Sequence, residues 1–406
     1  MSEKELPKTA YILLWFPKSS ETFIFSEVKN LLSYGLPVSV YTLYGRWKKD
    51  LSREMLSYHG KIVRLGVWWT GILPFFVLYW LLRSPVKTGR LAGLILCRRW
   101  KGLEKTAENL WACLCGFYLA YRFEKEKVQH IHAPWASGCA TAAWLIFRLT
   151  DIPFSFTIRA WDIHPPDSLI HEKTRDACFV RSNTRYNIGF LHSLTSCSPK
   201  KLHLVYNGLS MAAEKKNPVL MEAPYRLLAV GRLVEKKGYE YLLQAAALLK
   251  EQGIDFSLKI VGDGPCRGKL TRLHRSLQLE SHVTFCGFQP YEKMPDYYRN
   301  ADIFVMPCVI HSSGDRDGIP NALMEALVHA VPIISTPVSG IPELIEDGVT
   351  GRMVPERDPF ALADAIVMYT GDRQKALKMA EHGHKRVLEM FDTERNHKKV
   401  LALLAA

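Results

Sequence analysis

Short apolar runs alternate with longer helical patterns along almost the whole chain of 406 residues. Within these runs the apolar residues follow one another directly, as in parallel strands that are buried on both faces. An alternation of such strands with helices predicts an α/β fold with doubly wound parallel sheets. The strands expected in the first half are 10–15, 38–42, 128–133, 153–158 and 177–180.

The second half repeats this rhythm after a polar segment, 212–224, that contains two prolines. At roughly 150 residues per domain, the chain should form two or three domains. We expect two Rossmann-like domains that face a cleft, 1–209 and 210–387, with a C-terminal helix over 388–406 that packs back on the first. The strands expected in the second half are 226–230, 258–261, 283–286, 302–306 and 332–336.

Positive charge and tryptophan are concentrated in the first half. The net charge is +13, and residues 1–209 hold 28 of the 53 Lys and Arg but only 15 of the 40 Asp and Glu. All ten tryptophans lie between Trp15 and Trp161. This asymmetry predicts an anionic or interfacial partner for the first domain. Nucleic acid is excluded as that partner, because the sequence has no helix-turn-helix, finger or aromatic-basic sheet motif.

Residues 66–82 carry no charge, whereas 83–101 hold six Lys and Arg and no acid. The uncharged run is shorter than the about 20 residues of a membrane span, and Pro74 near its middle predicts a kink. Tryptophans and cations near its ends favour a segment at the headgroup level of an anionic membrane. A core helix and a true span are the alternatives.

The nine cysteines stand singly, with no Cys-x-x-Cys and no zinc-finger spacing, and the start of the chain lacks the pattern of a secretion signal. We therefore expect a cytoplasmic protein, peripherally associated with the inner face of the cell membrane, without structural zinc.

Two glycine-containing loops follow expected strands of the second half. In the first, Gly231 and Arg232 precede Lys237 and Gly238, and a helix follows. Glycines that let the backbone approach a ligand, with cations beside a helix N-terminus, suit a diphosphate. Surface cations on an ordinary loop are the alternative. The second loop, 262–265 (GDGP), is by itself also compatible with a tight turn.

A third loop, 317–325 (DGIPNALME), leads into another expected helix. Pro320 suits the first turn of that helix, and Gly318 lets the backbone approach a ligand. The free amides of the first turn can hold a phosphate. Asp317 precedes the helix and Glu325 lies inside it, so the two carboxylates bracket the phosphate site and can accept hydrogen bonds from hydroxyls on either side. A nucleotide-sugar has this layout.

In this order and spacing, the three loops and the stretch 326–354 resemble the donor domain of glycosyltransferase family 4, retaining enzymes of the two-domain GT-B fold. Asp317 departs from that family's pattern, which usually has Glu at this position. The resemblance implies that Arg232 and Lys237 neutralise the departing nucleoside diphosphate, that Glu325 holds the ribose, and that Asp317 faces the transferred sugar. It further implies that the donor contacts are Gly231, Gly262, Gly264, Phe288, Gly318, Ile319, Pro320, Asn321 and Glu325.

Asp315, Arg316 and Asp317 form a literal Asp-x-Asp, which in another glycosyltransferase fold binds Mn²⁺ or Mg²⁺. Because this triplet opens a Gly-x-Pro helix and phosphate-binding cations are already present, we interpret Asp317 as a sugar contact and expect no metal and no other cofactor. Retention carries over from the family. Asp317 is a poor candidate for a nucleophile, which favours front-face displacement.

Stretches in the first half resemble one branch of the same family. This branch makes exopolysaccharide and lipopolysaccharide and includes colanic-acid-type enzymes. This implies that His132 faces the acceptor and the reacting centre; a structural histidine is the alternative. We expect His130 to be structural and to point the other way. The residues proposed as acceptor ligands are Ser20, Glu21, Thr22, Arg159 and Asp162.

Taken together, the sequence predicts a glycosyltransferase that moves a sugar from a nucleotide-sugar to a lipid-linked saccharide in cell-surface polysaccharide or lipopolysaccharide synthesis. One alternative is a nucleotide-sugar epimerase, which would isomerise its donor without an acceptor. Another is a non-catalytic, membrane-bound saccharide-binding protein, against which the intact set of Arg232, Lys237 and Glu325 argues.

Overall fold

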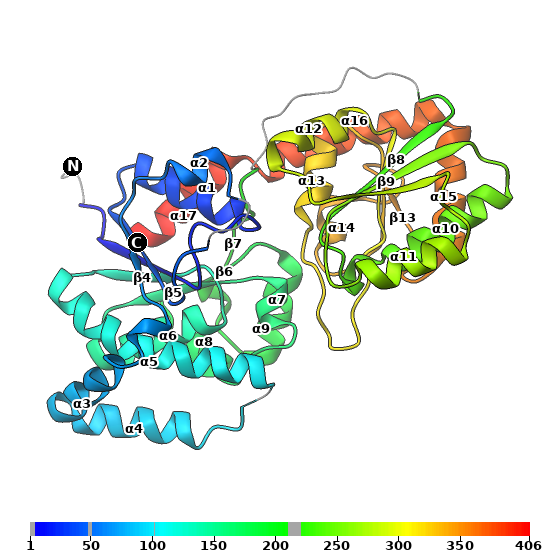
Figure 1. The fold of residues 1–406 in the computed structure, drawn as a ribbon. Helices are drawn as coiled ribbons and strands as arrows, with labels where there is room; N and C mark the ends of the chain where they lie inside the picture. The colour runs from blue at the N-terminus through cyan, green and yellow to red at the C-terminus, as the bar shows by residue number, and fades with distance from the viewer. Residues whose placement is uncertain (1–4, 48–50, 101, 210–220) are drawn as a thin grey trace. The chain divides into compact units, whose positions relative to one another are not determined.

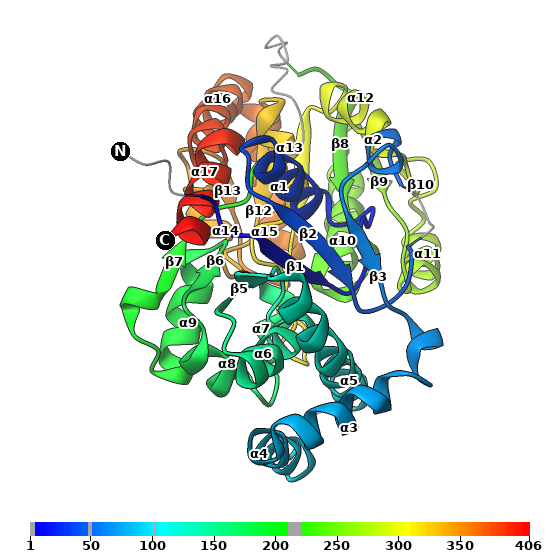
Figure 2. The same ribbon diagram turned by 90° about the vertical axis from the view of Figure 1, so that its left-hand side faces the viewer.

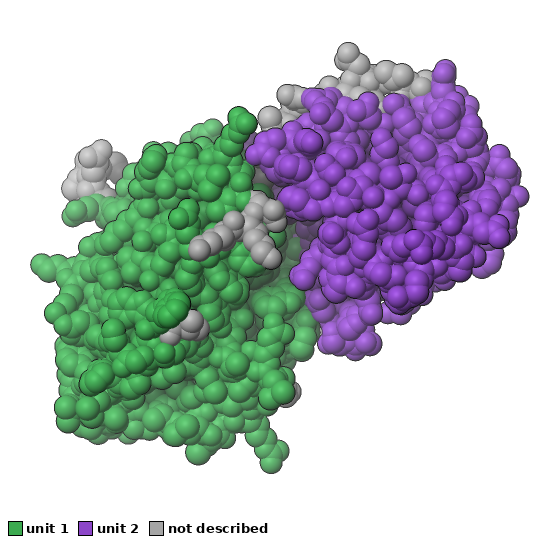
Figure 3. Space-filling model, viewed as in Figure 1, with its two compact units in different colours: residues 1–210, 393–406 green, residues 211–392 purple. Residues whose placement is uncertain are grey.

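A computed structural model describes residues 5–47, 51–100, 102–209 and 221–406. The chain divides into two compact units, residues 1–210 with 393–406 and residues 211–392, coloured separately in Figure 3 and traced as ribbons in Figure 1. Lys101, the expected boundary at residue 210 and most of the segment 212–224 lie outside the described residues.

Unit 1 is built on a seven-stranded sheet with the order β3-β2-β1-β4-β5-β6-β7, and all its paired strands are parallel. This confirms the predicted parallel α/β fold. The strands are β1 (Thr9–Leu13), β2 (Val38–Thr42), β3 (Ile62–Arg64), β4 (His130–Ala133), β5 (Phe154–Ile158), β6 (Val180–Ser182) and β7 (Leu202–Leu204).

Alternate residues of a strand serve opposite faces of this sheet. Tyr11 and Leu13 of β1 join the core beneath α1 (Thr22–Ser33) and α17 (Thr393–Ala405), whereas Ala10 and Ile12 join the core beneath α5 (Leu103–Glu126) and α6 (Gly138–Thr150) (Figure 2). Both faces are therefore buried, which is why the apolar runs are continuous. The helices of unit 1 are α1 (Thr22–Ser33), α2 (Arg53–Leu56), α3 (Leu73–Arg83), α4 (Pro85–Leu96), α5 (Leu103–Glu126), α6 (Gly138–Thr150), α7 (Ala160–Ile163), α8 (Ile170–Asp176), α9 (Arg185–Thr195) and α17 (Thr393–Ala405).

The uncharged segment 66–82 forms a short helical turn and then α3, which packs on α5. The expected mid-segment kink is wrong, because Pro74 lies in the first turn of α3, where its missing amide hydrogen is not needed. Leu73 and Trp80 are buried, while the opposite side of the helix is exposed. Within the described residues, no helix has the length and apolar character to cross a membrane.

A buried ion pair lies beneath α1. Glu27 of α1 contacts Arg181 of β6, and the two side chains are 2% and 0% exposed. The hydroxyl of Tyr11 donates to the same carboxylate at 3.3 Å. One turn along α1, the amide of Asn30 lies 2.8 Å from the ring of His397 on α17. Charge and hydrogen bonding therefore join the sheet, the first helix and the last helix of the unit.

Unit 2 is built on a six-stranded sheet, ordered β10-β9-β8-β11-β12-β13, in which every described pair is parallel. Its strands are β8 (Tyr225–Val230), β9 (Phe256–Val261), β10 (Val283–Gly287), β11 (Ile303–Met306), β12 (Ile333–Ser335) and β13 (Arg352–Met353). Its helices are α10 (Tyr239–Glu251), α11 (Arg267–Ser276), α12 (Met294–Arg299), α13 (Asn321–Val328), α14 (Ile341–Leu344), α15 (Pro359–Gly371) and α16 (Arg373–Met390). Residues 388–390 thus end α16 in unit 2, and the chain re-enters unit 1 only with α17.

Candidate active site

The loops at the carboxyl ends of β8 and β9 lie directly against each other in unit 2. The amide of Gly231 donates to the carbonyl of Val261 at 2.9 Å. A Cβ added to Gly262, whose φ is +136°, would lie only 2.1 Å from the carbonyl oxygen of Gly231. A Cβ added to Gly264, in the same turn, would lie 2.5 Å from the carbonyl oxygen of Leu233. Only residues without a side chain allow these two loops to approach so closely.

The loop after β8 also touches the chain that leaves β11. Gly238 has a φ of +69°, and a Cβ there would lie 1.8 Å from the carbonyl oxygen of Pro307. This contact holds the preceding residue, Lys237, beside the loop that follows β11. Its Nζ lies 2.8 Å from Oδ2 of Asp317. The structure therefore brings together two of the residues that the sequence singled out.

A second lysine completes this cluster. Nζ of Lys236 lies 3.0 Å from Oδ1 of Asp315 and 3.6 Å from Oδ1 of Asp317. Burial favours the neutral form of Asp317, but the charges of Lys237 and Lys236 outweigh it and hold the pKa of Asp317 below its usual value. Asp317 is therefore ionised at neutral pH. Sequence reasoning missed Lys236, since nothing in a run of two lysines shows which one faces a carboxylate.

Glu325 lies on α13 beside tyrosines that the sequence did not indicate. The hydroxyl of Tyr298 donates to Oε2 of Glu325 at 2.7 Å. Burial raises the pKa of Glu325, and the bond from Tyr298 and the charge of Lys237 oppose that rise only in part. The hydroxyl of Tyr291 is buried and has no hydrogen-bond partner in the described part of the chain. The other carboxylate oxygen of Glu325, Oε1, has no hydrogen bond among the described residues.

The remaining donor-site candidates surround the start of α13. Pro320 is the residue before the helix, with an extended ψ of 132°, and not part of its first turn as predicted. Ile319 and Pro320 are buried, whereas Gly318 and Asn321 are partly exposed. Among the described residues no side chain caps this helix, and of its first three amides only that of Leu323 has a hydrogen bond, to the carbonyl of Pro320.

Two further donor-site candidates have solvent-exposed side chains. Arg232 is exposed and makes no ion pair among the described residues, and Phe288 is 54% exposed. Among the described residues, neither side chain forms a hydrogen bond or ion pair with Lys237 or Asp317.

In unit 1, His132 is fully buried in the sheet. Its Nδ1 lies 2.8 Å from the hydroxyl of Ser155, and its Nε2 lies 3.1 Å from that of Thr157. Burial lowers the pKa of His132 to about 3. A neutral ring with both nitrogens occupied matches the structural alternative, and this geometry gives no support for a role facing the acceptor.

The expected opposite orientation of His130 is wrong, because residues i and i+2 of a strand share a face. His130 also contacts Ser155, at 2.8 Å.

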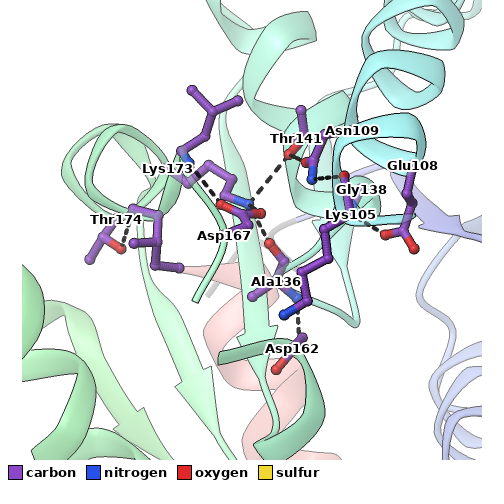
Figure 4. A network of polar contacts seen from close by, with 12 residues as sticks. Lys105, Glu108, Asn109, Ala136, Gly138, Thr141, Asp162, Asp167, Lys173 and Thr174 are labelled. Carbon is purple, nitrogen blue, oxygen red and sulfur yellow. Dashed lines mark hydrogen bonds and ion pairs between the residues drawn. The ribbon is translucent and has the colours of Figure 1, made fainter. Parts of the chain in front are cut away.

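Asp162 and Arg159 are also turned inward. The carboxylate of Asp162 accepts hydrogen bonds from the amides of Ala136, at 2.6 Å, and Arg159, at 2.7 Å, and burial raises its pKa to about 7. Asp162 thus anchors the loop between β4 and α6, which Lys173 and Glu108 also hold through backbone groups (Figure 4). In this position Asp162 holds backbone amides, and its geometry gives no support for a contact with the acceptor.

Arg159 follows β5 and is 4% exposed. It donates to Asn207 at 2.8 Å, and its guanidinium carbon lies 4.3 Å from the ring centroid of Phe23. One of its terminal nitrogens is buried and has no described partner. Burial lowers its pKa to about 10, so that it stays charged.

The other acceptor candidates lie just before α1 and at its first residue. Ser20 is exposed, Glu21 and Thr22 are partly exposed, and Glu21 accepts from Lys18 at 2.8 Å.

Comparisons with known proteins agree with this arrangement. The family described as glycosyl transferases group 1 matches residues 224–372. A protein of Escherichia coli K12 named as a colanic acid biosynthesis glycosyltransferase, WcaL, is 27% identical over 98% of this chain and 100% of its own length. The amylovoran biosynthesis glycosyltransferase AmsK of Erwinia amylovora is 38% identical over 48% of this chain and 50% of its own.

Among solved structures, HepE of Anabaena in complex with UDP-glucose has a TM-score of 0.70 at 16% identity, covering 98% of this chain and 99% of HepE. At that identity the likeness establishes the shared fold, which is the GT-B architecture predicted from the sequence.

Proposed function

We propose that this glycosyltransferase, whose residues 224–372 match the group 1 glycosyl transferase family, moves a sugar from a nucleotide-sugar to a growing cell-surface saccharide. The observation that carries the proposal is the set of Lys237, Asp317 and Glu325 at one edge of the second sheet, beside the start of α13. Both full-length and partial relatives bear names from exopolysaccharide synthesis, which is the process we propose for this chain.

The chemical step of such a transfer breaks a glycosyl–phosphate bond and builds negative charge on the leaving oxygen. We assign stabilisation of that charge to Lys237, to the exposed Arg232 and to the free amides at the start of α13, because donors fixed in advance are worth most where charge develops. Asp317 is ionised and partly exposed, so that it can accept hydrogen bonds from sugar hydroxyls. Glu325 has an oxygen available for the ribose.

We propose that the reaction needs no metal ion. Asp315 and Asp317 are the two carboxylates that would chelate one, and each contacts a lysine ammonium group. A divalent cation would have to displace those lysines. Activity should therefore persist in EDTA, and a strict requirement for Mn²⁺ or Mg²⁺ would contradict this assignment.

We further propose that the configuration of the transferred sugar is retained through front-face displacement, in which the leaving phosphate accepts the acceptor's proton. Asp317, which we place at the transferred sugar, is held by two lysines, and Glu325 is assigned to the ribose, so we propose neither carboxylate as a nucleophile. NMR of the product should show the donor's anomeric configuration. A trapped glycosyl-enzyme adduct would contradict the front-face route.

The acceptor we propose is a lipid-linked saccharide, which places the enzyme peripherally at the inner face of the cell membrane. The basic, tryptophan-rich character of unit 1 supports this placement. A membrane fraction that carries lipid-linked oligosaccharide should then accept the labelled sugar, whereas the free oligosaccharide should be a poorer acceptor.

The first test of the whole proposal is a thermal-shift screen against UDP, GDP, ADP and CDP. One nucleotide should stabilise the protein clearly, by about 2.7 kcal/mol at a concentration of 100 times its dissociation constant. Incubation with the matching nucleotide-sugar alone should leave the sugar unchanged. Isomerisation of the donor without acceptor would identify an epimerase, and no binding of any nucleotide would overturn the proposal.

A further inference from the structure

The helices α3 and α4 carry an exposed apolar surface on unit 1. On α3, Phe75, Leu78 and Leu82 are spaced three and four residues apart and so share one face of the helix. Leu82 is 78% exposed, and that face is turned away from the buried Leu73 and Trp80. We call this surface the apolar ridge; its members are Trp68, Phe75, Leu78, Leu82, Val86 and Leu96.

Large exposed apolar side chains gathered on two helices that pack together are uncommon on a monomeric protein and mark a surface with a partner. The helices α3 and α4 lie at the end of unit 1 away from α2, as Figures 1 and 2 both show.

Cations accompany the ridge, and two of them form no ion pair with any residue that the structure describes. Arg83 contacts Glu124, and Lys87 contacts Asp151, so these two charges are locally compensated. Arg90 on α4 and Arg99 just beyond it are exposed and make no ion pair among the described residues. The surface therefore combines apolar side chains with free positive charge. That combination fits the interface of an anionic bilayer better than a protein partner with a dry apolar face.

A pocket of about 510 Å³ opens at the carboxyl end of α4. Arg98, Arg99 and His171 line it, together with Leu94 and Pro166. Arg98 contacts Glu172, but its Nε is buried without a hydrogen-bond partner in the described part of the chain. The carboxylate of Asp167, which also lines the pocket, forms an ion pair with the buried Lys173. The acids at the pocket are thus compensated, while Arg99 is not.

We propose that the apolar ridge and this pocket together form a binding site for anionic phospholipid, with the ridge in the acyl-chain boundary of one leaflet and the pocket holding a headgroup phosphate. This inference rests on the membrane association proposed above and names the residues that would produce it. Two helices lying in the interface, with no span, agree with the length of α3 and α4.

The test is co-sedimentation of the full chain with vesicles of phosphatidylcholine, with and without phosphatidylglycerol. The wild-type protein should bind the anionic vesicles more tightly than the neutral ones. Leu82→Ser should weaken binding to both by roughly tenfold, because it removes one buried leucine from the interface. Leu56→Ser, at a leucine of α2 that is 60% exposed, is the matched control and should bind as wild type.

A second pair of variants distinguishes binding of a headgroup in the pocket from general electrostatic attraction to the membrane. Arg99→Gln should weaken binding to anionic vesicles by about fivefold and leave neutral vesicles unaffected. Arg90→Gln removes an equally exposed charge outside the pocket and should have a smaller effect.

Equal effects of Arg99→Gln and Arg90→Gln would show that the pocket holds no headgroup. Failure of the wild type to sediment, or wild-type binding by Leu82→Ser, would overturn the site as a whole. Donor and acceptor are absent from this assay, so its failure would leave the nucleotide screen, and with it the proposed transfer reaction, untouched.

Discussion

Replacing Arg181 with methionine should destabilise unit 1 strongly, and the loss should depend on pH. Arg181 and Glu27 are almost completely buried, and without the guanidinium the carboxylate would be left uncompensated in the core. Removing one partner of a buried pair costs about 3–5 kcal/mol. The side chain of methionine keeps most of the volume, so the loss measures the charge and not a cavity.

The pH dependence follows from the pKa of Glu27. Burial would raise that pKa, but the surrounding charges, that of Arg181 above all, outweigh burial and lower it from 4.5 to about 2. A difference of this size corresponds to about 3 kcal/mol of stability. Because the pKa is lower in the folded state, this stability is present above pH 4.5 and is lost as the pH falls toward 2. The deficit of Arg181→Met should therefore shrink in acid, where Glu27 becomes protonated.

Urea unfolding followed by tryptophan fluorescence measures this effect in unit 1 alone, since all ten tryptophans lie between Trp15 and Trp161. Arg175→Met is the matched control, because Arg175 belongs to the same unit and pairs with Asp176 while being 66% exposed. Its loss should stay below about 1 kcal/mol. If Arg181→Met cost no more than the control, or cost the same at every pH, the reasoning about a buried charge would be refuted.

Three further substitutions address the candidate site. Lys237→Met should lower kcat by roughly 10²–10³-fold through lost stabilisation of the leaving group, and steady-state kinetics with an unchanged unfolding curve would support this. Glu325→Gln should raise KM for the donor by about tenfold, as expected for one hydrogen bond to a charged group, and a pure loss of kcat would argue against ribose binding. His132→Leu should cost about 1–3 kcal/mol of stability, because the hydroxyls of Ser155 and Thr157 lose their partner, and should leave the pH–rate profile near neutrality unchanged. Loss of activity by this variant without loss of stability would restore a catalytic role.

The sequence predicted the interior of both sheets well, because strands buried on both faces must be apolar at successive positions. The strand Val38–Thr42 was placed at its observed bounds, and the other predicted strands differ by a few residues. The strands β3, β7 and β13 were missed. Each lies at the edge of its sheet and has only two or three residues, so its apolar pattern is too short to see.

The site was predictable where backbone geometry demands particular residues and not where side chains meet across strands. Gly262 and Gly238 mark close backbone contacts that only glycine permits, and those contacts bring Lys237 to Asp317. The burial of His132 depends on Ser155, which lies opposite it on β5, and that register is set by the fold as a whole. A histidine at a strand end looks the same in sequence whether its ring faces solvent or a neighbouring hydroxyl.

The assignment of α17 to unit 1 has a consequence for how the polypeptide must be made and handled. Unit 2 is, in effect, inserted into unit 1, whose last helix emerges from the ribosome after every strand of the other unit. His397, Val400 and Leu404 are buried against segments translated some 370 residues earlier. Cutting the chain before Thr393 would therefore leave unit 2 whole and remove a helix from unit 1, and a fusion partner at the C-terminal end would be attached to unit 1 and not to unit 2.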